Sequence, residues 1–192
     1  MNRWPQSETG CWCSSLKITV LFLKWRAAPY YCGVMNDPLY TQLKLGLLEQ
    51  LPVPVWPAGS RLEPFEAEKH SKSAHALLTE AYKNGGGRVG DFDRWWTALR
   101  DDPEYEPALF FLAADARGEI IGVAHCWTSS FLKDLVVGEW RRRGLGRALF
   151  LHACNVFRDR GATKFALKVE DSNPSGAVQL YQRLGMSKAD QD

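Results

Sequence analysis

The stretch that decides the fold runs from Val136 to Ala148 and reads VVGEWRRRGLGRA. An apolar strand pattern over residues 131–137 (FLKDLVV) leads into it. A helical pattern over residues 144–160 follows, with apolar side chains recurring on one side. The stretch therefore predicts a buried strand that passes through a glycine-rich turn directly into a helix.

The start of this helix has the properties of an anion site. A helix N-terminus presents backbone N–H groups without intrahelical partners and the positive end of the helix dipole, and together these bind phosphate. Gly144 and Gly146 have no Cβ atom, so a ligand can approach the backbone closely, and residues 141–143 (RRR) add charge-assisted hydrogen bonds. The residues predict a cradle for a diphosphate. The alternative is an ordinary helix start that carries surface arginines.

The rest of the C-terminal part alternates between strand and helix patterns. The expected strands cover residues 61–66, 108–114, 119–128, 131–137 and 163–169. The expected helices cover residues 67–84, 91–99, 144–160 and 173–184, with Asp91 and Asn173 as N-caps. Strands 108–114 and 119–128 predict a hairpin, and strand 131–137 follows it. The fold class is α/β, with a mixed, mostly antiparallel central sheet flanked by helices.

The N-terminal part differs in composition. Residues 1–34 hold three of the five cysteines and a single acid, and we expect them to be an unstructured segment or an upstream extension, with Met35 as the natural start. Residues 35–60 are expected to form an N-terminal segment and linker, with a short amphipathic helix over 38–51 that prolines then end. The main domain is expected to cover residues 61–192.

The glycine-rich stretch resembles a known family signature. Arg141-x-x-Gly144-x-Gly146 after an apolar strand is similar to the acetyl-CoA signature of the GNAT N-acetyltransferases. A second set of residues farther along the chain resembles the second half of that family's pattern: Leu167–Val169, Asn173, Ala177, Leu180, Tyr181 and Leu184–Met186. The two sets together are more specific than either alone.

The resemblance implies an activity and roles for individual residues. It implies transfer of an acetyl group from acetyl-CoA to a primary amine by direct attack, on either a small molecule or a protein. Tyr181 is implied as the general acid on the departing thiolate. The implied acetyl-CoA contacts are Leu135, Val136, Val137, Arg141, Arg142, Arg143, Gly144, Leu145, Gly146, Arg147, Ala148, Asn173 and Tyr181. A catalytically degenerate acyl-CoA-binding or interaction module of the same fold is the alternative.

The base that takes the proton of the amine is open from sequence. Asp134, His125 and Glu139 lie on or beside the expected central strands, and Asp134 is the candidate base that we carry forward. Each of the three also fits a structural or surface role. A catalyst that works by positioning alone is a further alternative.

Two departures from the family pattern stand out. The turn before Arg141 is one residue shorter than is usual in the family. The chain also ends seven residues after Gly185, so it offers at most one short strand where the family usually has one or two. Either the sheet is completed in another way, for instance by a partner chain in a homodimer, or the sequence is clipped and poorly active.

Composition excludes several classes of protein. A net charge of +2 with one short basic run does not indicate a nucleic-acid binder. The apolar run at residues 18–23 is too short to span a membrane, which takes about 20 residues. Five cysteines without framework spacing predict reduced thiols in the cytoplasm, and no zinc-ligand spacing occurs. The GxGxxG match at residues 85–90 follows a helix instead of a strand, so it does not predict a dinucleotide site.

Overall fold

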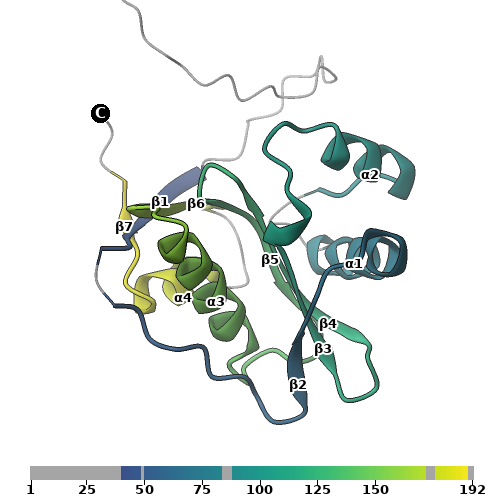
Figure 1. The fold of residues 1–192 in the computed structure, drawn as a ribbon, viewed down its shortest axis with the longest axis horizontal. Helices are drawn as coiled ribbons and strands as arrows, with labels where there is room; N and C mark the ends of the chain where they lie inside the picture. The colour runs from purple at the N-terminus through teal and green to yellow at the C-terminus, as the bar shows by residue number, and fades with distance from the viewer. Residues whose placement is uncertain (1–39, 49, 84–87, 172–175, 190–192) are drawn as a thin grey trace, which may run out of the picture. The chain divides into compact units, whose positions relative to one another are not determined.

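A seven-stranded sheet forms the centre of the fold, in the order β2-β3-β4-β5-β6-β1-β7 (Figure 1). The computed structural model describes residues 40–48, 50–83, 88–171 and 176–189. The strands are β1 Tyr40–Gly46, β2 Ser60–Glu63, β3 Phe110–Asp115, β4 Ile120–Trp127, β5 Phe131–Val137, β6 Lys164–Glu170 and β7 Ser187–Lys188. Only β5 and β6 pair in parallel, while the other described neighbours are antiparallel. The predicted mixed, mostly antiparallel sheet is confirmed.

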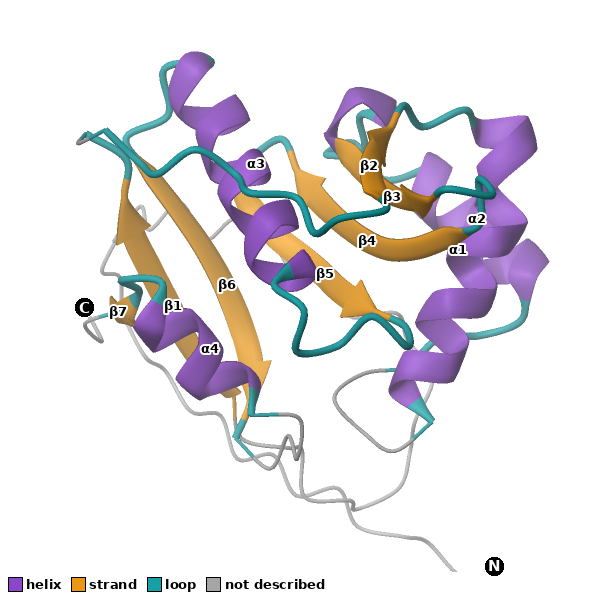
Figure 2. Ribbon diagram, turned by 90° about the horizontal axis from the view of Figure 1, so that it is seen from below, coloured by secondary structure: helices purple, strands orange, loops and turns teal. Residues whose placement is uncertain are grey.

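Helices cover both faces of the sheet (Figure 2). They are α1 Ala67–Tyr82, α2 Phe92–Arg100, α3 Leu145–Asp159 and α4 Ala177–Arg183, with a 3₁₀ turn at Pro107–Leu109. Helix α1 packs on β4 and β5 over one apolar cluster, and α3 packs on β3 to β6 over a second, larger cluster. The apolar positions of α1 and α3 recur at helical spacing, which is why each helix buries one side. In the part of the chain that the structure describes, no helix combines the length and apolar character needed to cross a lipid bilayer.

The helix predicted over residues 38–51 is wrong. Residues 40–46 form β1, which pairs in antiparallel register with all of β6, from Tyr40 opposite Glu170 to Gly46 opposite Lys164. Leu43 is fully buried and Leu45 packs against the core, so the segment carries the period-2 pattern of a strand. A short apolar segment is compatible with the periodicity of a helix and with that of a strand. Here pairing with the edge of β6 favours the strand.

Strand β1 also explains how the sheet is completed. It lies between β6 and the two-residue β7, which pairs with it at Leu43 and Lys44. The compact unit that contains the sheet also contains β1, in the part of the chain that was expected to be an N-terminal segment and linker. A strand from the N-terminal side of the domain therefore lies between β6 and β7 in the described sheet.

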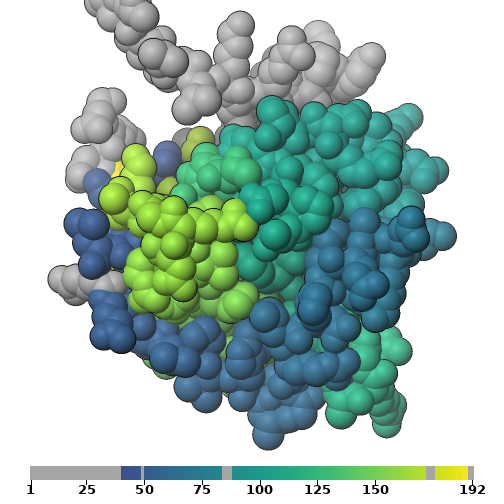
Figure 3. Space-filling view, in the orientation of Figure 1, coloured from purple at the N-terminus to yellow at the C-terminus, as the bar shows by residue number. Residues whose placement is uncertain are grey.

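The segment between β1 and β2 runs along the outer side of α3 (Figure 3). The side chain of Asn155 on α3 donates a 3.2 Å hydrogen bond to the carbonyl of Pro52, and Trp56 packs 6.1 Å from the ring of His152. Leu51 and Trp56 join the larger apolar cluster. Residues that were expected to be a linker thus form part of the packing around α3.

Other local predictions have mixed outcomes. Asp91 caps α2 as predicted, because its carboxylate accepts a 3.1 Å hydrogen bond from the backbone of Arg94. The last helix begins at Ala177, later than predicted. The predicted cap Asn173 lies outside the described residues, as do residues 1–34.

Candidate functional site

A cleft opens where β5 and β6 separate. The two strands pair at Phe131 with Ala166 and at Leu132 with Leu167, and no further pairs follow. Figure 2 shows them diverging toward their carboxyl ends. Residues from the separated parts of both strands line a cleft of about 680 Å³, which lies within the ~300–1,000 Å³ usual for small-molecule sites. The free edge of β5, beyond Leu132, has no strand partner on this side and faces the cleft, where its backbone can bind a ligand.

Most of the charged side chains that line the cleft are basic. Its basic lining residues are Lys133, Arg141, Arg142, Arg147, Lys168 and Arg183, whereas Glu170 is the one acidic residue in the described lining. This balance favours an anionic ligand.

The start of α3 forms one end of the cleft. Gly144 is the N-cap residue with φ at +92°, in the left-handed region that favours glycine. No side chain caps this helix, and the first intrahelical bond found here runs from the Ala148 amide to the Gly144 carbonyl. The amides of residues 145–147 therefore have no intrahelical partner, as the sequence predicts for an anion cradle.

Gly146 lines the cleft beside this cradle. A Cβ atom built there would lie 3.6 Å from Cγ2 of Val137, which is an ordinary contact. Packing within the protein therefore does not require glycine at this position. A glycine there leaves the backbone open to close approach by a ligand.

The turn before α3 contains a residue with a left-handed backbone. Arg142 adopts φ of +63°, which is uncommon for a residue with a side chain. The Arg141 side chain folds back and donates a 3.3 Å hydrogen bond to the Val137 carbonyl. Arg143 instead stacks over the ring of Trp140, with 4.9 Å from its guanidinium carbon to the ring centre.

Most of the implied acetyl-CoA contacts come together in this cleft. Those that line it are Leu135, Val136, Val137, Arg141, Arg142, Gly144, Gly146, Arg147 and Tyr181. Leu145 and Ala148 are buried in or beside the core, and Arg143 does not line the cleft. Leu145 and Ala148 can therefore contribute backbone groups alone. Asn173 lies outside the described residues.

Tyr181 reaches the cleft from α4. Its ring is buried in the larger apolar cluster, 5.8 Å from the ring of Phe150. No hydrogen bond to its hydroxyl is found among the residues that the structure describes. Burial, with the negative charge of Asp134 second, raises the pKa of this phenol well above its usual value. The hydroxyl therefore stays protonated and is available as a donor.

Asp134 is buried on the opposite face of the sheet. Its Oδ1 accepts a 2.8 Å hydrogen bond from the Tyr82 hydroxyl of α1, and its Oδ2 lies 3.4 Å from Nδ1 of His125 and 3.6 Å from Nζ of Lys133. Burial raises the pKa of this carboxyl, but the Lys133 charge and the hydrogen bonds from His125 and Tyr82 outweigh it and hold the pKa well below the usual range. Asp134 does not line the cleft, and a low pKa makes it a poor proton acceptor.

His125 lies opposite Asp134 in the register of β4 and β5. Burial lowers the pKa of its imidazole, although the carboxylate of Asp134 opposes this, so the ring is neutral at neutral pH. An ionised Asp134 accepts the proton on Nδ1, and Nε2 is then buried without a partner among the described residues. His125 packs against Phe110 and Trp127 and does not reach the cleft.

Sequence reasoning missed Tyr82 as a site residue. Its spacing from the other apolar residues of α1 places it on the inner side of the helix, and in the structure it lines the cleft as well as packing inward. Its partner Asp134 is 52 residues away, so no local signal in the sequence could connect the two. The sequence analysis also did not single out Lys133, Lys168 and Arg183, which line the cleft.

Comparison with known proteins agrees with this geometry. The family model described as Acetyltransferase (GNAT) family matches residues 66–186. The chain belongs to the GNAT family. The match contains α1, the cleft strands and both helices that border the cleft, but not β1.

Relatives within the GNAT family include enzymes with different acceptors in their names. Mycothiol acetyltransferase of Thermobispora bispora is 32% identical over 173 residues, covering 81% of this chain and 56% of the relative. Streptothricin acetyltransferase of Streptomyces lavendulae is 30% identical over 118 residues, covering 57% of each chain. This chain spans about half the length of the mycothiol acetyltransferases that it matches.

A solved structure supports the same family. The GCN5-related N-acetyltransferase from Sphaerobacter thermophilus superposes with a TM-score of 0.69 at 26% identity. The superposition covers 80% of this chain and 50% of that one.

Proposed function

We propose that this chain transfers an acetyl group from acetyl-CoA to a primary amine. The observation that carries the proposal is the cleft between the diverging strands β5 and β6, which ends at the uncapped start of α3. A long, flexible and anionic cosubstrate fits such a site, because one part meets an open strand edge and the other meets helix amides and basic side chains.

Different residues of the cleft would bind different parts of acetyl-CoA. The free edge formed by Leu135, Val136 and Val137 would hold the amide-containing arm, as an added strand would be held. The amides of residues 145–147, with Arg142 and Arg147, would hold the diphosphate. Tyr181 lies in the same cleft and would face the thioester sulfur.

The chemistry follows as a direct attack. The neutral amine nitrogen bonds to the thioester carbonyl carbon, the carbon–sulfur bond breaks, and the sulfur leaves as a thiolate. Tyr181 donates a hydrogen bond and then its proton to that sulfur, and the proton released by the nitrogen passes to water. No covalent enzyme intermediate is needed, and holding both reactants in place supplies much of the rate gain.

The acceptor class is a primary amine. The names of the relatives, mycothiol acetyltransferase and streptothricin acetyltransferase, favour a small molecule over a protein. A cytoplasmic location and a homodimer stay predictions from sequence.

A second candidate function is binding of acyl-CoA without turnover. The left-handed backbone of Arg142 in the shortened turn favours it, because this turn lies beside the cradle. Calorimetry with acetyl-CoA and thiol release with a panel of primary amines separate the two functions. Binding with amine-dependent thiol release supports the transferase, and binding without release from any amine supports the second candidate.

A further inference from the structure

Two tyrosines from opposite faces of the sheet line the cleft. Tyr82 comes from α1 and packs with the smaller apolar cluster, whereas Tyr181 comes from α4 and packs with the larger one. Both line the cleft, which is open between the separated strands β5 and β6. The negative charge of the same carboxylate, Asp134, contributes to the raised pKa of both phenols.

The two hydroxyls differ in what they can offer to a ligand. Tyr82 lines the cleft and donates its only proton to Oδ1 of Asp134 at 2.8 Å, so toward any other group its oxygen can only accept a hydrogen bond. Burial and the Asp134 charge raise the pKa of Tyr82, which keeps the phenol protonated and the donation in place. Tyr181 has no such acceptor among the described residues. Tyr82 is therefore a hydrogen-bond acceptor toward the cleft, and Tyr181 is a donor.

The orientation of Tyr82 is held by a buried network. The second oxygen of Asp134 is occupied by His125 at 3.4 Å and by Lys133 at 3.6 Å. Both Asp134 and His125 sit on central strands at directly paired positions, so the carboxylate has little freedom to turn. A carboxylate fixed in this way also places a negative charge directly behind the Tyr82 hydroxyl.

We propose that Tyr82 accepts a hydrogen bond from the attacking amine, and that Asp134 is the positioning residue that orients the Tyr82 hydroxyl. This inference rests on the proposed function, since it assigns the side of the cleft that receives the amine. An amine nitrogen carries N–H donors, which match an oxygen that can only accept. With the amine held by Tyr82 and the sulfur by Tyr181, the carbonyl carbon lies between them, and the acceptor enters from the α1 side.

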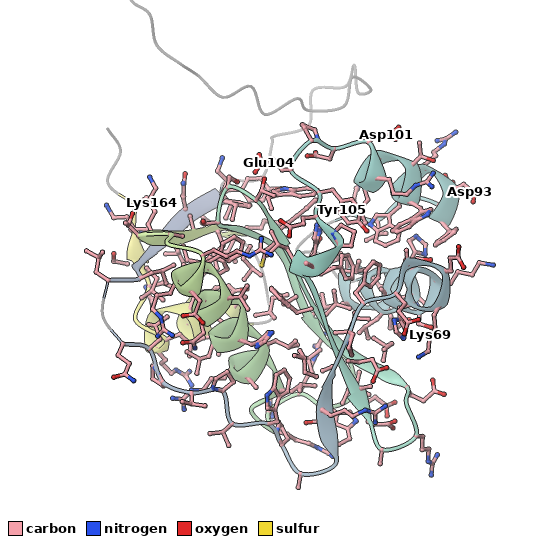
Figure 4. The ribbon with its side chains drawn as sticks, viewed as in Figure 1. Lys69, Asp93, Asp101, Glu104, Tyr105 and Lys164 are labelled. Atoms are coloured by element: carbon pink, nitrogen blue, oxygen red, sulfur yellow. The ribbon has the colours of Figure 1, made fainter. Side chains whose placement is uncertain are left out.

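The test uses the full chain and steady-state thiol release from acetyl-CoA with methylamine, ethanolamine, glucosamine and glycinamide. Tyr82→Phe keeps the ring and removes the hydroxyl. For the best amine we expect its KM to rise about tenfold or more, while the acetyl-CoA Kd stays within about twofold. Tyr105→Phe is the matched control, since it removes a second buried hydroxyl, one that has no hydrogen-bond partner among the described residues and does not line the cleft. Tyr105 is labelled in Figure 4.

A double-mutant cycle tests the positioning role. Asp134→Asn should raise the amine KM in the same direction, and the double variant with Tyr82→Phe should be no worse than Tyr82→Phe alone. A merely structural role of Asp134 predicts additive losses and a changed acetyl-CoA Kd. Tyr82→Phe alone remains decisive where Asp134→Asn does not fold.

The outcomes separate this inference from the proposed function. A Tyr82→Phe variant with the amine KM of the Tyr105→Phe control overturns the role of Tyr82 and leaves the transferase intact. Equal losses in amine and acetyl-CoA binding also overturn it. A parent protein that binds acetyl-CoA but releases no thiol with any amine overturns the proposed function, and this inference with it.

Discussion

The hydroxyl of Tyr82 donates a 2.8 Å hydrogen bond to Oδ1 of Asp134 and so ties the end of α1 to β5, the strand that borders the cleft. The contact joins α1 to the region where β5 separates from β6. This hydrogen bond also bears on the role of Asp134. With both oxygens occupied and no place in the cleft lining, Asp134 acts through Tyr82 instead of taking a proton from the amine.

The two glycines at the start of α3 should respond differently to alanine. Gly146→Ala fits the protein, because the new Cβ meets Val137 at an ordinary 3.6 Å, but it narrows the cradle. We expect acetyl-CoA affinity to fall about tenfold, a loss of ~1.4 kcal/mol, with little change in melting temperature. Calorimetry and thermal unfolding measure the two quantities.

Gly144→Ala is the matched comparison. Its Cβ meets nothing within 4 Å, but the backbone has φ of +92°. The left-handed backbone costs an alanine about 1–2 kcal/mol, so the melting temperature should fall by several degrees. Equal stability of the two variants would contradict this assignment of their roles.

Tyr181→Phe should slow turnover without weakening cosubstrate binding. The ring keeps its packing against Phe150, and only the donor to the sulfur is lost. Loss of general-acid catalysis typically lowers kcat by about 10²–10⁴-fold. Thiol release at saturating acetyl-CoA measures kcat, and calorimetry measures affinity. Turnover at the parent rate would remove Tyr181 from the mechanism.

The basic lining should make acetyl-CoA affinity depend on salt. Arg147→Gln should weaken binding several-fold at low ionic strength, and the difference should shrink at ~1 M salt, where screening acts within about 3 Å. Arg94→Gln is the control, because Arg94 is exposed on α2 and pairs with Asp91. An equal loss in both variants would indicate a general charge effect and not a contact in the cleft.

The contribution of β1 can be measured with two nearby leucines. Leu43 is 0% exposed in β1, whereas Leu48 is 83% exposed just after it. We expect Leu43→Ala to lower the free energy of unfolding by about 2–5 kcal/mol. Leu48→Ala should change it by less than about 0.5 kcal/mol. Urea unfolding gives both values, and equal small effects would mean that β1 is not part of the stable fold.

Stability should fall as the pH decreases below the ordinary pKa of histidine. Burial lowers the pKa of His125, so the unfolded chain takes up a proton at this position before the folded chain does. The loss starts near pH 6.5 and has a limiting slope of about 1.4 kcal/mol per pH unit. Burial lowers the pKa of His152 too, which adds a contribution of the same sign.

His125→Phe isolates the contribution of His125. The variant suits the aromatic surroundings of Phe110 and Trp127, and it should flatten the decline in unfolding free energy between pH 6.5 and 5. Urea unfolding at three pH values in this range measures the slope. An unchanged slope would mean that His125 is protonated equally in the folded and unfolded chain.

The sequence predicts well where local signals are dense. Residues 131–160 contain an apolar strand, paired glycines and a regular helical pattern, and the structure has β5, a turn and α3 there. It predicts poorly where long-range pairing decides. Residues 40–46 fit helix and strand alike until β6 is placed beside them, and Tyr82 gains its role only from Asp134, on a strand distant in the chain.

A crystal structure of this chain with acetyl-CoA tests the central claim most directly. We expect the diphosphate oxygens to lie about 3 Å from the amides of residues 145–147, with the arm along the free edge of β5 and the sulfur beside Tyr181. Acetyl-CoA bound elsewhere, or those amides bonded to groups of the protein itself while the ligand is present, would contradict the account.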